Sequence, residues 1–230
     1  MITRLLQSLV SFKALISFQH GQQRQNDFCP PNGALAVSGG RDIAPVINDL
    51  LKQDWAIRIA TRDFHPHNHI SFATQHPGCE PLTSTYTIQN PENPEETQQT
   101  VLWPPHCIQG TPGCELIDEL EKHKIDVVID KGQDQRVESY SGFGPPFKDP
   151  PVSRTRLEAL LKEKEVNEVL VVGIAYDYCV KCTAIDAADA GFKTSVLEDG
   201  CKAVQQDETS LDRLRQDYED HSVTVVRGKA

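Results

Sequence analysis

The sequence has no uninterrupted apolar segment of the roughly 20 residues that a helix needs to span a bilayer. It also has no surplus of basic residues, because 23 Lys and Arg stand against 33 Asp and Glu and leave a formal net charge of −10. An acidic chain is a poor partner for a nucleic-acid backbone or an anionic membrane surface. Both absences predict a soluble protein that has neither a membrane nor a nucleic acid as its main partner.

A secretory signal and a regular cysteine pattern are lacking as well. The seven cysteines are odd in number and irregularly spaced, which favours a reducing compartment and free thiols. Cys179 and Cys182 form a CxxC without a second CxxC, so a zinc or redox motif is disfavoured there. Residues 1–26 contain no acid and three bases and thus weakly resemble a mitochondrial presequence. Their apolar part can also form a strand, so a cytoplasmic location is favoured and a mitochondrial one is left open.

No internal repeat and no linker divides the 230 residues, which are enough to bury a large core. We therefore expect a single domain over residues 1–230, in which residues 1–24 are atypical. Apolar, β-branched runs predict buried strands at 55–60, 125–129, 169–174, 193–197 and 223–226. Helical patterns lie at 42–53, 113–122, 153–164, 177–190 and 207–218, the last with Asp207 as N-cap.

This alternation predicts an α/β fold with a doubly wound, mostly parallel sheet and helices on both faces. Such sheets place their sites at the carboxyl ends of the strands. The two long connections, residues 62–105 and 131–151, are expected to be functional or disordered.

Histidines and one carboxylate follow the strand at 55–60, in the stretch TRDFHPHNHISFA. Asp63 and His65 form a D-x-H, His67 and His69 come close behind, and His106 could close the set from the second half of the same connection. One carboxylate with imidazoles suits Zn²⁺ or a similar divalent ion. On spacing alone, a solvated histidine-rich loop fits these residues about equally well.

Lys131 and Cys179 each follow directly after a predicted strand. Lysines in such places are mostly surface charges, but beside a thiolate Lys131 would lower the pKa of the thiol. Cys179 falls in the first turn of a helix, where the free N–H groups favour a thiolate and can bind an oxyanion. Most buried helical cysteines are nevertheless inert, and Cys182, one turn further on, is expected to serve packing only.

Five segments occur together and in order: QNDFCPPNGALAV, TRDFHPHNHISFA, LWPPHCIQGTPGCEL, DKGQDQRVESYSGF and GIAYDYCVKCTAIDAADAGF. In this arrangement the chain resembles the nicotinamidase branch of the isochorismatase-like cysteine hydrolases from residue 25 to about 200. The resemblance implies a metal-dependent amidohydrolase that converts nicotinamide to nicotinate and ammonia through a cysteine thioester and so feeds NAD salvage. The partner it implies is this small molecule, and a homo-oligomer is left open.

The resemblance also assigns roles to residues. Cys179 matches the nucleophile, Lys131 the lysine of an Asp–Lys–Cys triad, and the backbone N–H groups of Ala175 and Cys179 the oxyanion hole. The Ile174–Ala175 bond matches a cis peptide. A divalent metal ion, with zinc favoured, is implied at Asp63, His65 and His106, and the ring of the substrate would be walled by Phe28, Trp103 and Tyr140.

The triad aspartate of this family is missing from its expected place. Counting back four residues from Asp27 reaches Gln23, and the polar insert SFQHGQQR, residues 17–24, is expected to disrupt the first strand after KALI. Gln23 cannot take the thiol proton, and His20 is a poor substitute because the strand that would aim it is broken. Phe64 and Tyr176 are smaller departures that could alter the pocket.

Two explanations of the missing aspartate compete. A sequence or splice error in this stretch is favoured, because the other site residues are intact. The alternative is a catalytically impaired homologue that binds nicotinamide. A related cysteine hydrolase acting on another small amide is the runner-up as an enzyme.

Overall fold

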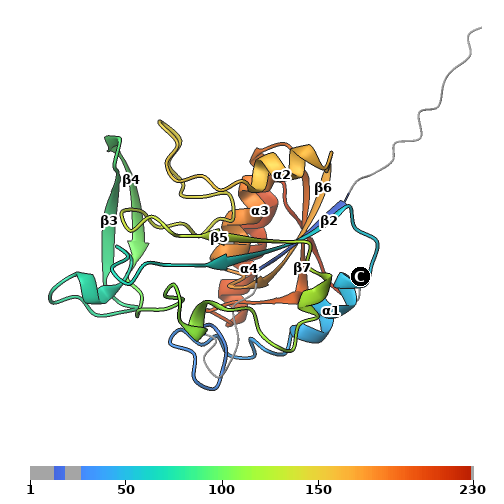
Figure 1. Ribbon diagram of the computed structural model, residues 1–230, viewed down its shortest axis with the longest axis horizontal. Coiled ribbons are helices and arrows are strands. Elements are labelled where there is room, and N and C mark those ends of the chain that lie inside the picture. Colours follow the sequence, from blue (N-terminus) through green and yellow to red (C-terminus); the bar gives the residue numbers. More distant parts are fainter. Residues whose placement is uncertain (1–12, 19–26, 229–230) are drawn as a thin grey trace, which may run out of the picture.

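The computed structural model describes residues 13–18 and 27–228, which form a six-stranded sheet and a separate two-stranded sheet (Figure 1). The strand order of the large sheet is β5-β2-β1-β6-β7-β8, and all neighbouring strands in it are parallel. Its strands are β1 (Lys13–Phe18), β2 (Ile57–Asp63), β5 (Val127–Lys131), β6 (Glu168–Ile174), β7 (Lys193–Lys202) and β8 (Thr224–Val226). The predicted doubly wound α/β sheet is confirmed.

Four α-helices lie within or close to predicted ranges: α1 (Ala44–Leu51), α2 (Leu157–Glu163), α3 (Cys179–Asp189) and α4 (Glu208–Asp220). Helix α1 packs against β1 and β7, α3 against β6 and β7, and α4 beside β8 and α3. Helix α4 begins after Asp207, whose carboxylate accepts a hydrogen bond from the N–H of Ser210 at 3.0 Å, so the predicted N-cap is confirmed. None of the helices in the described part of the chain has the length and apolar content that a membrane span requires.

Strand β1 lies in the centre of the sheet, and Ala14, Leu15 and Ile16 are fully buried. Because consecutive side chains of a strand point to opposite faces, both faces of the sheet are covered here. The strand does not stop at Ile16 as expected. It continues into the polar insert, where the backbone of Phe18 pairs with β2 and β6. Residues 19–26, and with them the predictions about His20 and Gln23, lie outside the described residues.

The predicted helix at 113–122 is wrong. A single 3₁₀ turn forms at Pro112–Cys114, and the backbone is already extended at Glu115, with φ −89° and ψ 156°. Neighbouring side chains bind the backbone of this segment: Asn48 donates to the carbonyl of Glu119 at 2.6 Å and accepts from the N–H of Glu121 at 2.8 Å. Tertiary hydrogen bonds thus replace the bonds of a helix, although the apolar spacing is helical.

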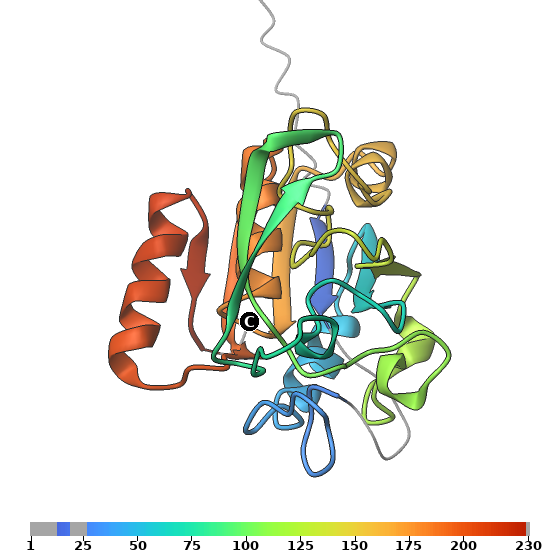
Figure 2. The same cartoon turned by 90° about the vertical axis from the view of Figure 1, so that its left-hand side faces the viewer.

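The long connection 62–105 is not structureless. It contains an antiparallel hairpin of β3 (Thr85–Asn90) and β4 (Asn93–Val101), which stands apart from the large sheet (Figures 1 and 2). Buried Ile88 packs with residues of the second long connection, and Glu96 accepts a hydrogen bond from the N–H of Lys148 at 2.7 Å. The two long connections therefore fold against each other and bring their polar residues to one end of the sheet.

Candidate active site

The strand order places β1 between β2 and β6, so the chain changes its direction of winding beside β1. In parallel α/β sheets the crevice for ligands lies at this point, outside the carboxyl ends of the strands. Asp63 is the last residue of β2 and Lys131 the last residue of β5, and the register pairs them directly. Residues 175–179 leave β6 at the same edge and begin α3.

Lys131 is fully enclosed and joins two parts of this edge. Its ammonium group forms an ion pair with Asp63, donates to the carbonyl of Ser139 at 2.7 Å and lies 3.7 Å from Sγ of Cys179. Burial alone would lower the pKa of Lys131, but the negative charge of Asp63, and that of Cys179 when it ionises, outweigh burial and raise this pKa. Lys131 is therefore held as a cation beside Cys179.

Cys179 is the first residue of α3 and is 4% exposed. Burial raises the pKa of its thiol to about 12, and Lys131 acts in the opposite direction. The Ile174–Ala175 peptide is cis, as the resemblance implies. The carbonyl of Ala175 accepts hydrogen bonds from the N–H groups of Tyr178 and Val180 at 3.1 and 3.0 Å, so a tight turn leads from β6 to Cys179.

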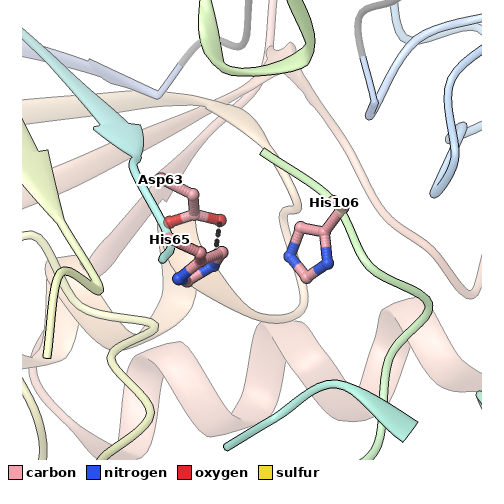
Figure 3. Close-up of side chains that lie close together, drawn as sticks. All are labelled: Asp63, His65 and His106. Carbon is pink, nitrogen blue, oxygen red and sulfur yellow. Dashed lines mark ion pairs between the residues drawn. The ribbon is translucent and has the colours of Figure 1, made fainter. Parts of the chain in front are cut away.

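The structure brings Asp63, His65 and His106 together (Figure 3), and one ligand atom of each lies within 4.8 Å of the others. Nδ1 of His65 is 2.8 Å from the carbonyl oxygen of Gly132, and Nδ1 of His106 is 2.8 Å from that of Pro104. Since a carbonyl only accepts, each Nδ1 is the donor, and in a neutral ring the lone pair then lies on Nε2. This is the usual second contact of metal-binding histidines, and the buried set fits a divalent cation.

A second buried group shares His65 with the first and adds His69 and Glu138. The ring centroids of His65 and His69 are 4.1 Å apart. The pKa of His65 is held well below its usual value, first by burial and then by the nearby His69. Nε2 of His69 has no hydrogen-bond partner among the described residues. His67 is exposed and belongs to neither group. The sequence offered no signal for Glu138, because glutamate is ordinarily a surface residue.

Aromatic side chains form walls around these groups. Phe28 meets the ring of His106 edge-on at 5.2 Å, and Nε1 of Trp103 donates to the hydroxyl of Tyr140 at 2.9 Å. Tyr178 was not predicted from the sequence. The centroid of its ring lies 5.1 Å from that of Trp103 and 5.4 Å from that of Tyr140. The complete lining of this cavity is Phe28, Leu35, Asp63, His65, Trp103, His106, Glu138, Tyr140, Ala175, Tyr178, Cys179 and Val204.

Phe64 and Tyr176, the two smaller departures from the family pattern, are both absent from this lining. The guanidinium of Arg62 lies 4.8 Å above the ring of Phe64. Tyr176 stacks on Tyr218 at 5.1 Å, and the hydroxyl of Tyr218 donates to the carbonyl of Tyr176 at 2.7 Å. Both aromatic side chains therefore lie outside the cavity walls.

Comparison with known proteins gives relatives over most of the chain. A family model described as the Isochorismatase domain matches residues 23–225. The nicotinamidase of Acinetobacter baylyi is 43% identical over 180 residues, which are 78% of this chain and 78% of that protein. The structure of yeast nicotinamidase bound to the inhibitor nicotinaldehyde has a TM-score of 0.86 at 34% identity and covers 94% of this chain and 100% of the yeast chain. The pyrazinamidase of Pyrococcus horikoshii in complex with zinc has a TM-score of 0.70 at 30% identity, covering 94% and 99%. By its sheet, its cavity and the extent of these matches, the chain belongs to the isochorismatase family.

Proposed function

We propose that this chain hydrolyses nicotinamide to nicotinate and ammonia, with Cys179 as the nucleophile. The proposal depends on a single cavity that is lined by both Cys179 and the set of Asp63, His65 and His106, while Lys131 lies 3.7 Å from Sγ of Cys179. A cavity with aromatic walls and few polar groups suits a flat heteroaromatic ring that carries one amide. The nicotinamidases among the relatives support this substrate. The product would feed NAD salvage.

Sγ of Cys179 would attack the carboxamide carbon and form a C–S bond. The C–N bond then breaks, and a proton goes to the nitrogen so that ammonia leaves. Water adds to the thioester carbon, the C–S bond breaks, and nicotinate and the free thiol result. Lys131 would stabilise the thiolate, and the backbone N–H groups of Ala175 and Cys179 would bind the negative charge on the carbonyl oxygen.

Asp63, His65 and His106 would hold a divalent cation, and the donor set of one carboxylate and two imidazoles favours zinc. The zinc complex of the Pyrococcus horikoshii relative is consistent with this choice. When bound, the ion would supply a positive centre for the pyridine nitrogen of the substrate. The cavity walls, Phe28 and Trp103 among them, would orient the ring.

Binding of nicotinamide without turnover is a second candidate, and one observation favours it. Among the described residues, no carboxylate is hydrogen-bonded to Sγ of Cys179, and its partner there is Lys131. A thiol whose pKa is raised to about 12 needs a base before it can attack. In the family register that base is absent, because Gln23 stands in its position.

An assay of ammonia release separates these candidates. The full chain, supplied with zinc, is incubated with nicotinamide beside Cys179→Ala, and nicotinamide binding is measured for both by calorimetry. We expect release by the parent chain and none by the variant, with binding retained in both. Binding without release would support the second candidate, and release only from another small amide would support a related cysteine hydrolase. Turnover that survives Cys179→Ala would overturn the mechanism.

A further inference from the structure

Asp27 places a buried carboxylate next to the candidate metal site without lining the cavity itself. The residue is 9% exposed, and its Oδ2 accepts a hydrogen bond from the N–H of Cys107 at 2.7 Å. Its Oδ1 is 3.4 Å from the N–H of Ala34. The Cys107 contact spans 80 residues of sequence, so it ties together two distant segments and is no local turn. A buried carboxylate is tolerated only when such donors reach it.

The peptide groups of Cys107 link Asp27 to both predicted histidine ligands. While the N–H of Cys107 donates to Asp27, its carbonyl accepts from the N–H of His65 at 3.0 Å. Two residues on, the N–H of Gln109 donates to the carbonyl of His65 at 2.8 Å. His106 directly precedes Cys107, so the two histidines belong to backbone segments that are bonded to each other, with Asp27 at the end of the chain of bonds.

The backbone of Cys107 requires such support, because its φ of 47° lies in the left-handed region that non-glycine residues rarely adopt. Hydrogen bonds on both sides of this residue hold the conformation that turns His106 towards His65. The side chain contributes a weaker contact, with Sγ 3.6 Å from the carbonyl of Gly113.

Gly113 leaves room for the carboxylate. A Cβ added at this glycine would overlap the carboxylate of Asp27. The backbone of Gly113 is not in the left-handed region, so its conformation does not demand glycine. Glycine is needed here because Asp27 comes so close. The carboxylate of Asp27 thus lies close against both Cys107 and Gly113.

We propose that Asp27 is a positioning residue for the metal site: by holding the Cys107 peptide it sets His106 against His65. The inference rests on the metal-binding part of the proposed function. It assigns a role to the aspartate of QNDF that is distinct from that of the missing triad aspartate. Residues that orient metal ligands typically change the affinity for the metal by about 10- to 100-fold when they are replaced.

The test measures zinc affinity of the purified full chain by competition with a chromophoric chelator, without any substrate. Asp27→Ala removes the acceptor, and Gly113→Ala would displace it, because the added Cβ would overlap Oδ2, the oxygen that accepts from Cys107. We expect each to weaken zinc binding by about 10-fold or more. Asp27→Asn keeps one oxygen that can accept from Cys107 and is expected to lie between them and the parent chain.

Asp126→Asn is the matched control. The carboxylate of Asp126 also accepts a backbone hydrogen bond, from the N–H of Arg58 at 2.7 Å, but it precedes β5 and so lies at the opposite edge of the sheet. The zinc affinity of the Asp126→Asn variant is expected to equal that of the parent chain. Circular dichroism shows which variants fold, and if Asp27→Ala does not, Gly113→Ala and Asp27→Asn decide.

The outcomes separate this inference from the function on which it rests. A parent chain that binds no zinc overturns the metal site and the role of Asp27 together. A parent chain that binds zinc, with folded Asp27 and Gly113 variants that bind it equally well, overturns the role of Asp27 alone. Equal weakening in Asp126→Asn would also count against it, because the effect would then be general destabilisation.

Discussion

The carboxylate of Asp63 and the ammonium group of Lys131 form a buried ion pair between the last residues of two neighbouring parallel strands. The same lysine lies 3.7 Å from Sγ of Cys179, and the same aspartate belongs to the candidate metal set. One pair thus connects the proposed nucleophile with the proposed cation. Any change to either partner should therefore affect stability as well as chemistry.

Asp63→Asn is expected to lower the free energy of unfolding by about 3–5 kcal/mol, because it leaves the ammonium of Lys131 buried without its counter-ion. The double variant Asp63→Asn with Lys131→Met removes both charges and should recover much of this loss. Guanidinium denaturation of the metal-free chain measures both. A double variant no more stable than Asp63→Asn would show that the pair is not the cause.

His106→Ala is expected to abolish stoichiometric zinc binding, since it removes one of three ligands from the set with Asp63 and His65. His67→Ala is the matched control, because His67 lies in the same histidine-rich stretch but is exposed. Metal content after dialysis, measured by atomic emission, distinguishes the two variants. Zinc retained by His106→Ala and lost from His67→Ala would refute the assignment of ligands.

Replacing residues 17–24 by Val-Val-Asp-Val restores the family register before QNDF. If the missing aspartate is the only defect, ammonia release from nicotinamide should rise by about 10⁴-fold, the order of a lost triad acid. The same replacement with Asn in place of Asp repairs the strand without the base and should remain slow. Equal rates for the two replacements would show that the aspartate is not what the chain lacks.

Tyr140→Phe is expected to weaken nicotinamide binding by about 5- to 100-fold, because Nε1 of Trp103 loses its acceptor in a buried wall. Calorimetry in the Cys179→Ala background measures the effect without turnover. Tyr86→Phe, in the exposed part of the hairpin, serves as the control and should bind as the parent does. Unchanged binding by Tyr140→Phe would remove these two residues from the substrate walls.

Much of the sheet was predictable because buried parallel strands are short, apolar and β-branched, and such runs are visible in a single sequence. The helix expected at 113–122 failed for a reason that no local pattern contains: Asn48, from α1, binds the backbone of that segment. The hairpin at 85–101 was missed because its strands are mostly polar, and only Ile88 and its distant neighbours give it a core.

The sequence alone determined the family, the parallel sheet and the residue types available for chemistry, because apolar runs and the D-x-H and cysteine segments are local properties of the chain. Only the tertiary structure decided how these residues are combined. The register of β2 against β5 pairs Asp63 with Lys131, burial raises the pKa of Cys179, and Asp27 reaches Cys107 across 80 residues. Register, burial and long-range hydrogen bonds arise from packing, since each depends on residues that are far apart in the chain.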